Sequence, residues 1–288
     1  MKPAAFQYHA PKTIDEAVAM LAEYAPDDGR VLAGGQSLVP TMAFRLARPH
    51  HLIDINGIAA LDRLAVEDGR LVIGAGVRHQ TFRRPVVAGP LGGLLSAVMH
   101  HIAHYPIRTR GTFCGSVAHA DPASEWCLVA ATLGAEMVAR STRGVRVIAA
   151  ADYFQGIMTT ALEPDELLAE VRLPLLPAAT RWGFYEFNRR AGDFALGMAL
   201  VAYDVVNGVI AAPRVGVGGA EANACRIAEA EAQLAGRPPG GAAFTAAGAA
   251  AAAAIDPLTD AQTDAVYRRE LVAVVTRRAL ERAAALPS

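Results

Sequence analysis

The sequence predicts an α+β fold, in which two small α+β units form an N-terminal region and a three-stranded antiparallel sheet with a helical bundle forms a C-terminal domain. Two glycine-rich stretches, 33–38 and 110–122, each stand between an extended run and a helical run. Residues 174–180 read as a linker, and beyond it three β-rich segments precede alanine-rich helices. We therefore expect an N-terminal region of 1–175 and a C-terminal domain of 176–288.

The first unit, about 1–58, has the pattern of a small βαβ arrangement. A helix over 14–24 begins at a capping box and continues with apolar residues at helical spacing. A short strand over 30–33 leads into the first glycine stretch. A helix that has Pro40 in its first turn and a second strand over 52–55 follow. The glycine turn therefore lies at a corner between strand and helix.

The second unit, about 59–175, alternates strands and helices. We expect a strand over 71–75, a helix over 91–102, a helix that ends at Gly134, strands over 135–140 and 145–149, and a helix turn or strand edge over 165–173. Asp121 is predicted to cap the helix that ends at Gly134, with Pro122 at its first position. A cofactor contact is the alternative role for Asp121.

The C-terminal domain is predicted to contain a sheet and then helices. The expected strands cover 182–188, 195–206 and 209–217, and the expected helices cover 225–234, 242–254 and 261–285. The alanine run within these helices is low in complexity, but alanine is the best helix former, so a helix is favoured over disorder.

The two glycine stretches have a chemistry that suits an anionic ligand. Glycine lets the backbone approach a ligand closely, and N–H groups at such turns bind anions, phosphate above all. Two such loops in one chain suggest a pyrophosphate that is held from two sides. Neither loop matches the G-x-G-x-x-G or the G-x-x-x-x-G-K-[ST] fingerprint, so plain turns are the alternative interpretation.

Composition excludes several classes of protein. The net charge of −1 gives no support for a nucleic-acid partner. The three cysteines, Cys114, Cys127 and Cys225, form no C-x-x-C pair, so a metal or iron–sulfur site held by this chain alone is not expected. Their small and odd number suits a reducing compartment. The uncharged, mostly alanine stretch 241–255 is shorter than the ~20 residues of a membrane span, and the first residues lack the apolar core of a signal peptide. We expect a soluble cytoplasmic protein.

Several motifs together resemble one family. They are Ala33-Gly34-Gly35-Gln36-Ser37-Leu38 with Leu52-Ile53-Asp54-Ile55, Ile107-Arg108-Thr109-Arg110-Gly111-Thr112 with Ala118-His119-Ala120-Asp121-Pro122-Ala123-Ser124-Glu125, and the later Asp165-Glu166-Leu167-Leu168 and Arg189-Arg190-Ala191-Gly192-Asp193-Phe194. The sequence is similar in them to the FAD-binding medium subunit of molybdenum hydroxylases, the carbon monoxide dehydrogenase and xanthine dehydrogenase family. The resemblance covers nearly the whole chain.

The resemblance implies a fold, a cofactor and partners. The fold would be a vanillyl-alcohol-oxidase-like FAD-binding region of two subdomains, followed by a C-terminal domain of the carbon monoxide dehydrogenase flavoprotein type. The chain would be an oxidoreductase subunit that binds FAD and passes electrons from iron–sulfur clusters to an external acceptor. Molybdenum cofactor and iron–sulfur clusters would lie on a large and a small partner subunit, in a dimer of heterotrimers. Hydroxylation of substrate would require no catalytic residue of this chain.

The resemblance also implies cofactor-binding residues, all named in this numbering. Around the first loop they are Val31, Leu32, Ala33, Gly34, Gly35, Gln36, Ser37 and Leu38, and around the second they are Thr112, Cys114, Gly115, Ser116, Ala118 and Asp121. Glu125 matches an acidic position at the adenosine ribose, Ile102 an apolar position beside the adenine, and Leu168 and Phe194 positions near the flavin. A carboxylate suits ribose hydroxyls, which donate to it, better than a pyrophosphate, which repels it.

One residue departs from the family's pattern. The second loop of the family usually reads Thr-x-Gly-Gly, and Cys114 stands where the first of these glycines would be. If the position needs a positive φ, cysteine would cost about 1 kcal/mol or more of conformational free energy there. If the position needs only a small residue, cysteine would fit. A packing residue and a reactive thiol are the two interpretations of Cys114.

Other interpretations of the chain stay open at this point. His100, His101 and His104 have the spacing of a metal site on a helix, but the glutamate of the metalloprotease pattern is absent, so surface or loop-packing histidines are the alternative. A self-sufficient FAD oxidoreductase would need a substrate-domain insertion that this length does not provide. A non-enzymatic alternative is a scaffold that kept the fold but lost the flavin, and Cys114 in the second loop would then indicate that loss. No G-x-S-x-G elbow supports a hydrolase.

Overall fold

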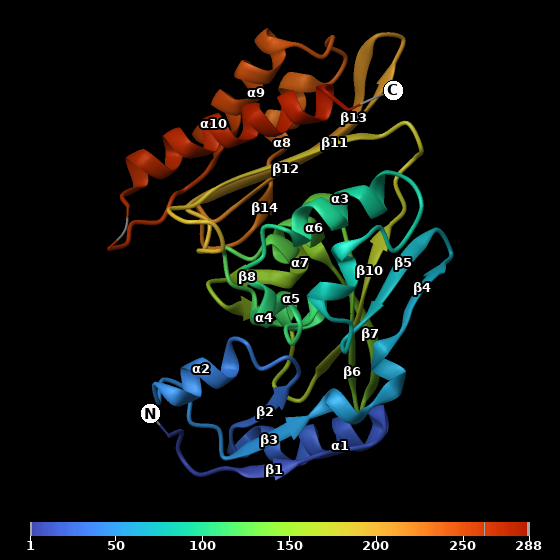
Figure 1. The fold of residues 1–288 in the computed structure, drawn as a ribbon, viewed down its shortest axis with the longest axis vertical. Helices are drawn as coiled ribbons and strands as arrows, with labels where there is room; N and C mark the ends of the chain where they lie inside the picture. Colours follow the sequence, from blue (N-terminus) through green and yellow to red (C-terminus); the bar gives the residue numbers. More distant parts are fainter. Residues whose placement is uncertain (1, 262, 287–288) are drawn as a thin grey trace.

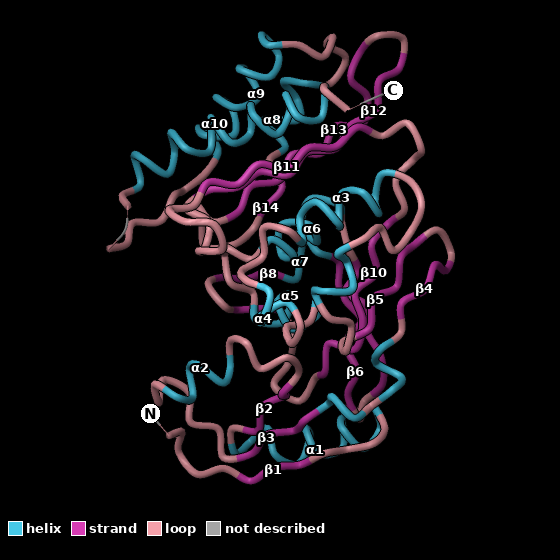
Figure 2. The backbone as a smooth tube through the Cα atoms, in the orientation of Figure 1, coloured by secondary structure: helices cyan, strands magenta, loops and turns pink. Residues whose placement is uncertain are grey.

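The computed structural model describes residues 2–261 and 263–286. Three units follow one another along the long axis of the molecule: an N-terminal unit (2–58), a middle unit (59–176) and a C-terminal unit (177–286) (Figure 1). Each unit has its own sheet, and helices lie beside each sheet (Figure 2).

The N-terminal unit is a parallel three-stranded sheet with the predicted βαβ corner. Its elements are β1 (Gln7–His9), α1 (Ile14–Tyr24), β2 (Gly29–Leu32), α2 (Leu38–Ala43) and β3 (His51–Asp54), and the strand order is β1-β3-β2. Both pairings are parallel. Thr13 caps α1, since its hydroxyl accepts from the N–H of Glu16 at 3.1 Å. The first glycine stretch joins β2 to α2, as predicted, while β1 was not predicted.

The middle unit is built on an antiparallel five-stranded sheet with the order β4-β5-β10-β6-β7. Its strands are β4 (Leu64–Glu67), β5 (Arg70–Gly74), β6 (Glu136–Ser141), β7 (Gly144–Ala149) and β10 (Leu167–Pro174), beside the short pair β8 (Phe154–Gly156) and β9 (Thr159–Thr160). Its helices are α3 (Pro90–Met99), α4 (Tyr105–Arg108), α5 (Phe113–His119), α6 (Glu125–Leu133) and α7 (Ala150–Tyr153). The segment that the sequence left as a helix turn or strand edge is β10, the central strand.

The predicted cap at Asp121 is wrong. The helix begins at Glu125, and its cap is Ser124, whose hydroxyl accepts from the N–H of Cys127 at 3.4 Å. The Asp121 carboxylate instead accepts from the N–H of Ala123 at 2.8 Å, which forms a turn before the helix. The chain needs this turn because Ala120, with a φ of 50°, ends α5 and the chain must reverse before α6. The predicted stop at Gly134 is confirmed, with a φ of 69°.

The C-terminal unit pairs its sheet with a layer of helices. The strands are β11 (Arg181–Phe187), β12 (Gly197–Val206), β13 (Val209–Gly218) and β14 (Cys225–Arg226), in that order and antiparallel, and the helices are α8 (Ala228–Leu234), α9 (Gly241–Ala254) and α10 (Ala265–Ala284). The three predicted strands are present, and β14 adds a short fourth. The predicted helix over 225–234 starts later because its first residues form β14. The predicted helix over 261–285 starts at Ala265, where Asp264 caps it, and residue 262 lies outside the described residues.

The central strand of this sheet is buried on both faces. Met198, Leu200 and Ala202 of β12 join the core of the N-terminal and middle units, whereas Ala199, Val201 and Tyr203 join a second core with α8, α9 and α10. The sheet therefore fixes the C-terminal unit against the middle unit. None of the helices in the described part of the chain combines the length and the apolar character that a membrane span requires.

The contact of β11 with α10 predicts a loss of stability in Gly183→Ala. A Cβ atom at Gly183 would clash with the carbonyl oxygen of Ala279 and lie 2.8 Å from the backbone nitrogen of Ala283. Because the strand and the helix would have to separate, we expect the free energy of unfolding to fall by about 1–3 kcal/mol in urea denaturation followed by circular dichroism. Gly241→Ala, where a Cβ meets open space, is the control, and equal losses in the two variants would contradict the prediction.

Candidate functional site

The two glycine loops meet in space. Gly34 of the first loop lies against Arg110 and Gly111 of the second: a Cβ atom at Gly34 would clash with the carbonyl oxygen of Arg110 and stand 2.6 Å from the Cα of Gly111. Gly35 has a φ of 71°, which side chains other than glycine rarely adopt. The first loop is therefore glycine-rich for two reasons, close approach at one residue and backbone conformation at the next.

The loops differ in how many backbone donors they leave available. Among the described residues, no acceptor pairs with the N–H groups of Gly35, Gln36 and Ser37. In the second loop, the N–H of Gly115 donates to the hydroxyl of Thr112 at 3.0 Å. Unpaired N–H groups in a concave loop attract an anion, so the first loop offers the stronger set of donors.

Backbone hydrogen bonds with residues 77–79, and a buried pair of His79 with Trp126, hold the second loop in place. The N–H of His79 donates to the carbonyl of Gly111 at 2.9 Å, and the N–H of Phe113 donates to the carbonyl of Val77 at 3.0 Å. The imidazole Nδ1 of His79 accepts from the indole N–H of Trp126 at 2.9 Å. Burial, with smaller contributions from nearby arginines, lowers the pKa of His79 to about 4. His79 is therefore neutral near pH 7, as an acceptor at Nδ1 must be.

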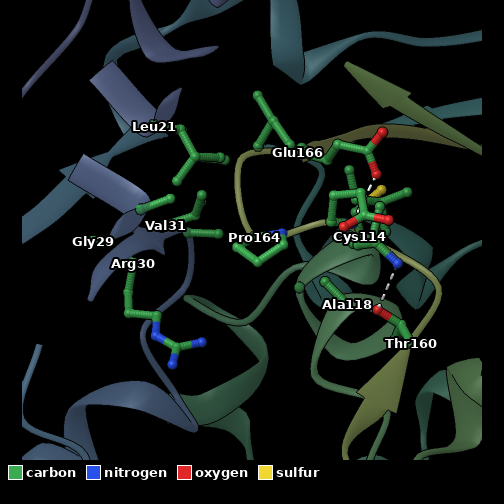
Figure 3. Close-up of a pocket in the computed structure, with 18 of the residues that line it drawn as sticks. Leu21, Gly29, Arg30, Val31, Cys114, Ala118, Thr160, Pro164 and Glu166 are labelled. Carbon is green, nitrogen blue, oxygen red and sulfur yellow. Dashed lines mark hydrogen bonds between the residues drawn. The ribbon is translucent and has the colours of Figure 1, made fainter. Parts of the chain in front are cut away.

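A cavity of about 520 Å³ lies between the N-terminal unit and the middle unit. Leu21, Gly29 and Val31 form one side of it, and Cys114, Ala118 and Thr160 form the other (Figure 3). The segment between β9 and β10 closes it, where the buried carboxylate of Glu166 is held by Arg146 at 2.7 Å. The mixture of apolar walls with a few polar groups, at this volume, is typical of a ligand site.

A smaller and more polar cavity, about 360 Å³, lies on the other side of the first loop. Its lining residues are Leu32, Ala33, Gly34, Gly35, Gln36, Val39, Pro40, Asp54, Asn56 and Arg110. Ala33 lines both cavities, so the first glycine loop separates them. Arg110 is exposed and brings a positive charge to the loop whose N–H groups are unpaired. The geometry suits an extended ligand with an anionic centre near Gly34.

The structure brings together about half of the residues that the sequence singled out. Those that line the larger cavity are Val31, Ala33, Cys114, Gly115, Ala118 and Leu168, and those that line the smaller one are Leu32, Ala33, Gly34, Gly35 and Gln36. Those that line neither of these cavities are Ser37, Leu38, Ile102, Thr112, Ser116, Asp121, Glu125 and Phe194. Among the latter, Ile102 is buried in the core and Phe194 is 72% exposed.

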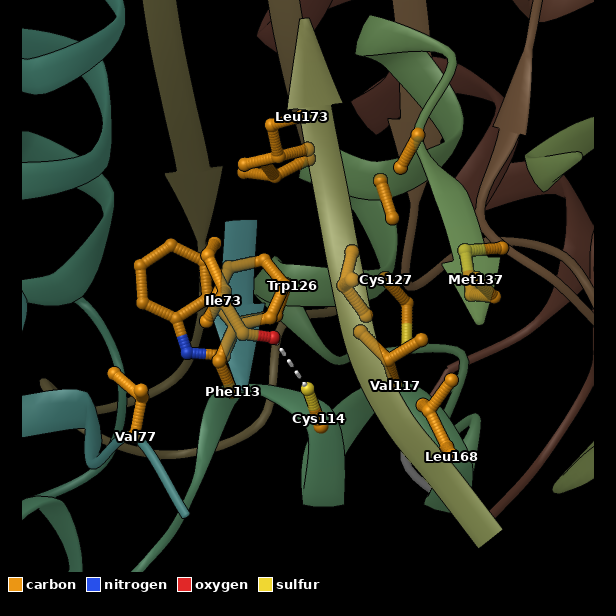
Figure 4. Close-up of a cluster of buried hydrophobic side chains, with 14 of the residues drawn as sticks. Ile73, Val77, Phe113, Cys114, Val117, Trp126, Cys127, Met137, Leu168 and Leu173 are labelled. Carbon is orange, nitrogen blue, oxygen red and sulfur yellow. Dashed lines mark hydrogen bonds between the residues drawn. The ribbon is translucent and has the colours of Figure 1, made fainter. Parts of the chain in front are cut away.

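Cys114 is a packing residue in this structure. It lies within α5, and its φ is not positive. Its side chain is buried, and the thiol donates to the carbonyl of Ile73 at 3.3 Å (Figure 4). Burial raises the pKa of this thiol far above its usual range, which disfavours the reactive thiolate. The position therefore requires a small residue and no special backbone conformation.

Glu125 pairs with a carboxylate of the C-terminal unit. Burial raises the pKa of Glu125, and the charge of Glu186 on β11 raises it further. Burial also raises the pKa of Glu186, one of whose oxygens is buried without a hydrogen-bond partner and lies 3.7 Å from His101 Nδ1. Because the pKa of each group is raised, the two glutamates carry less negative charge near neutral pH than two ionised carboxylates would.

The three histidines at metal-site spacing make different contacts. His101 faces Glu186, while His104 lies against Gly192, where a Cβ atom would meet its ring. The main-chain oxygens of His100, Ile102 and Ala103 accept from the guanidinium of Arg108 at 2.6–3.0 Å. In the described part of the chain, no group of three metal-ligating side chains is placed to hold a metal ion.

Sequence reasoning missed the polar residues that surround the first loop. Asn56 donates to the carbonyl of Ala33 at 2.8 Å, and Arg78 hydrogen-bonds both to Asn56 and to the carbonyl of Arg110. The only sequence signal was Asp54, a polar residue between apolar neighbours at the end of β3. Arg78 lies more than twenty residues from either partner, so no local pattern indicates its contacts.

Comparisons with known proteins identify the family. Residues 4–176 match the FAD binding domain in molybdopterin dehydrogenase, and residues 182–283 match the CO dehydrogenase flavoprotein C-terminal domain. The chain belongs to the FAD-binding medium subunits of molybdenum hydroxylases. This confirms the resemblance, the fold class and FAD as the cofactor.

Similar proteins match over nearly their whole length. The chain is 38% identical to the caffeine dehydrogenase subunit beta of Pseudomonas sp. (strain CBB1), over 99% of this chain and 96% of that protein. It is 37% identical to the nicotine 6-hydroxylase medium subunit of Paenarthrobacter nicotinovorans, over 99% of each. A carbon monoxide dehydrogenase structure from Hydrogenophaga pseudoflava, which lacks the Mo-pyranopterin moiety of its cofactor, superposes with a TM-score of 0.95 at 35% identity, over 99% of each chain.

The residues of the site fit FAD. A diphosphate needs close backbone approach, donors and positive charge, and the first loop provides Gly34 and Gly35, unpaired N–H groups and the neighbouring Arg110. The aromatic ends of a dinucleotide need apolar walls, which the larger cavity provides. The individual contacts remain proposals.

The meeting of the loops predicts that Gly34→Ala removes FAD. The added Cβ would push the first loop away from Arg110 and Gly111, so the donors would no longer face one ligand from two sides. We expect the visible flavin absorbance per protein to fall to less than about a tenth, since a displacement of about 1 Å in such a site has effects of that order. Gly240→Ala, which faces open space, should keep full occupancy. Full occupancy in Gly34→Ala would contradict the prediction.

The neutral state of His79 predicts a dependence of stability on pH. Its pKa is lowered from 6.5 to about 4, so its contribution is complete above pH 6.5 and is lost as pH falls from 6.5 toward 4. Between pH 7 and pH 5, we expect the wild type to lose about 2 kcal/mol of unfolding free energy relative to His79→Gln, which does not titrate but still offers an acceptor to Trp126. Urea denaturation of both proteins at each pH measures this difference in unfolding free energy. Parallel pH profiles would reject the role of His79.

Proposed function

We propose that this chain is the electron-transfer subunit of a heteromeric molybdenum-containing hydroxylase or dehydrogenase. In this proposal it holds FAD non-covalently and receives electrons from iron–sulfur clusters of a small partner subunit, while a large subunit carries the molybdenum cofactor. The observation that carries the proposal is the meeting of the two glycine loops between two cavities, in a chain of this family.

The cysteine count supports the need for partners. An iron–sulfur cluster is commonly held by four cysteine thiolates, and the whole chain has three cysteines. Two of them, Cys114 and Cys127, are buried in the core. Similar proteins are named as medium chains or subunits, among them the carbon monoxide dehydrogenase medium chain of Afipia carboxidovorans. We propose the same kind of assembly for this chain, with two further subunits and a dimer of heterotrimers.

The chain's own residues would bind and orient the cofactor. The N–H groups of Gly35, Gln36 and Ser37 would donate to the diphosphate, and Arg110 would balance its charge. Val31 and Leu168 would contact an aromatic end and exclude water from it. Bound FAD supplies the redox chemistry, because it can accept and release electron pairs that no side chain here can carry.

The more distant residues keep proposed roles. Glu125 would contact the adenosine ribose, Ile102 would lie beside the adenine, and Phe194 would lie near the flavin. With a raised pKa, Glu125 would be able to donate as well as to accept. The exposed Phe194 is available to contact a ligand or a partner subunit. The division into domains at 175 and 176 is likewise proposed, and the family matches end and begin close to it.

The proposal predicts a yellow protein that co-purifies with two partners. Acid precipitation of the complex, isolated by a tag on this chain, should release FAD into the supernatant. The isolated chain should pass electrons from a reduced dye to an acceptor but should hydroxylate no substrate, because molybdenum and iron would be on the partners. Metal analysis and a substrate panel, with and without partners, check this. A colourless chain that takes up no added FAD, or a lone chain that hydroxylates a substrate without molybdenum, would overturn the proposal.

A further inference from the structure

One arginine connects the two glycine loops. The Arg78 side chain begins just after β5, and its Nη1 donates to the carbonyl of Arg110, at the start of the second loop. Its Nη2 donates to the Oδ1 of Asn56. The Nδ2 of Asn56 in turn donates at 2.8 Å to the carbonyl of Ala33, the residue before Gly34. A continuous chain of hydrogen bonds therefore runs from the first loop to the second.

The contact at Gly34 explains why a donor is needed there. The carbonyl oxygen of Arg110 lies so close to Gly34 that a Cβ atom would clash with it. A carbonyl covered in this way by the other loop's backbone is costly unless a donor pairs with it, and Arg78 is that donor. The same guanidinium reaches Asn56, so one planar group serves both loops.

The two ends of this series of hydrogen bonds are anchored differently. On the second-loop side, backbone hydrogen bonds between Val77 and Phe113 and between His79 and Gly111 hold the backbone of Arg78. On the first-loop side, Asn56 is exposed, and its backbone N–H donates to Asp54 at 2.8 Å. Asp54 also accepts from the Tyr8 hydroxyl at 2.5 Å. The middle unit therefore provides a fixed base, and Arg78 reaches from it to the N-terminal unit.

The charges around Arg78 point to an anion. Arg78 is partly buried, and burial and the nearby charge of Arg110 both lower its pKa. The charges of Asp62 and Asp54 act on this pKa in the opposite direction. Asp54 lines the smaller cavity together with Arg110 and Asn56. Two guanidinium groups are thus placed close together there, with a carboxylate beside them. A diphosphate bound at Gly34 would relieve their repulsion.

We propose that Arg78 and Asn56 form a clasp that fixes the separation of the two glycine loops, which makes Arg78 a positioning residue for the diphosphate of FAD. This inference rests on the proposed function. Lysine cannot replace Arg78 in the clasp, because an ammonium group lacks the planar fork that reaches two acceptors at fixed geometry.

The test measures the dissociation constant of FAD from the deflavinated full chain by fluorescence quenching, in Arg78→Met, Arg78→Lys, Asn56→Ala and the Arg78→Met, Asn56→Ala double variant. We expect about tenfold weaker binding or more in both Arg78 variants and in Asn56→Ala, a factor that corresponds to about 1.4 kcal/mol. We expect the double variant to bind no more weakly than Arg78→Met, because the two residues act in series. Arg63→Met, which removes an arginine paired with Glu67 and Glu170 away from the loops, should bind FAD like the wild type.

Each other outcome has a distinct meaning. A wild type that binds no FAD overturns the proposed function and the clasp together. Wild-type affinity in both Arg78 variants overturns the clasp alone. Wild-type affinity in Arg78→Lys with weak binding in Arg78→Met would show that charge alone matters, which overturns the clasp. Additive losses in the double variant would show that the two residues act independently, which also overturns it. Thermal unfolding of each deflavinated variant identifies any that is not folded, and Asn56→Ala, at an exposed residue, then provides the test alone.

Discussion

The close contact of Gly34 with Arg110 and Gly111 is the constraint on which the site depends. It joins the N-terminal unit to the middle unit, and the cavities lie on the two sides of the loop that makes it. The contact is connected to the core, because Gly111 bonds to His79 and His79 accepts from Trp126, whose ring packs against Phe113 at a centroid distance of 4.7 Å. A buried aromatic cluster thereby determines the position of the second loop. The geometry of the loop pair thus rests on His79, Phe113 and Trp126, which line neither cavity.

The C-terminal unit is fixed against the middle unit through its sheet. Because β12 is buried on both faces, the sheet cannot shift without disturbing both cores. Glu186 on the neighbouring β11 is therefore held near Glu125 of the middle unit; its charge adds to the effect of burial in raising the pKa of Glu125, whereas burial raises the pKa of Glu186. The charge state at this edge is a joint property of two units. A change in the packing between them would alter the charge of this carboxylate pair without altering either glycine loop.

Local pattern predicted most elements, and long-range contact explains what it missed. The capped α1, the stop at Gly134 and the hairpin of β6 and β7 all follow from neighbours in sequence. The short β1 and β4 were missed because three- and four-residue strands carry almost no periodicity. The start of α6 was misplaced because Asp121 and Ser124 are both good caps, and only the reversal after α5 decides between them. The glycine loops were found by sequence, but Asn56 and Arg78 were not, since their contacts cross more than twenty residues.

The two loops use glycine for different physical reasons, which explains the cysteine in the second. At Gly35 the backbone has a positive φ, and at Gly34 no Cβ fits, so neither residue tolerates a side chain. In the second loop the backbone is already helical at Cys114, and its sulfur enters the core, where Ile73 supplies an acceptor. The next residue, Gly115, is restricted, because a Cβ there would stand 2.6 Å from the Thr112 hydroxyl that accepts its N–H. A small residue is enough at Cys114, and its presence is not a sign of a site that has lost its ligand.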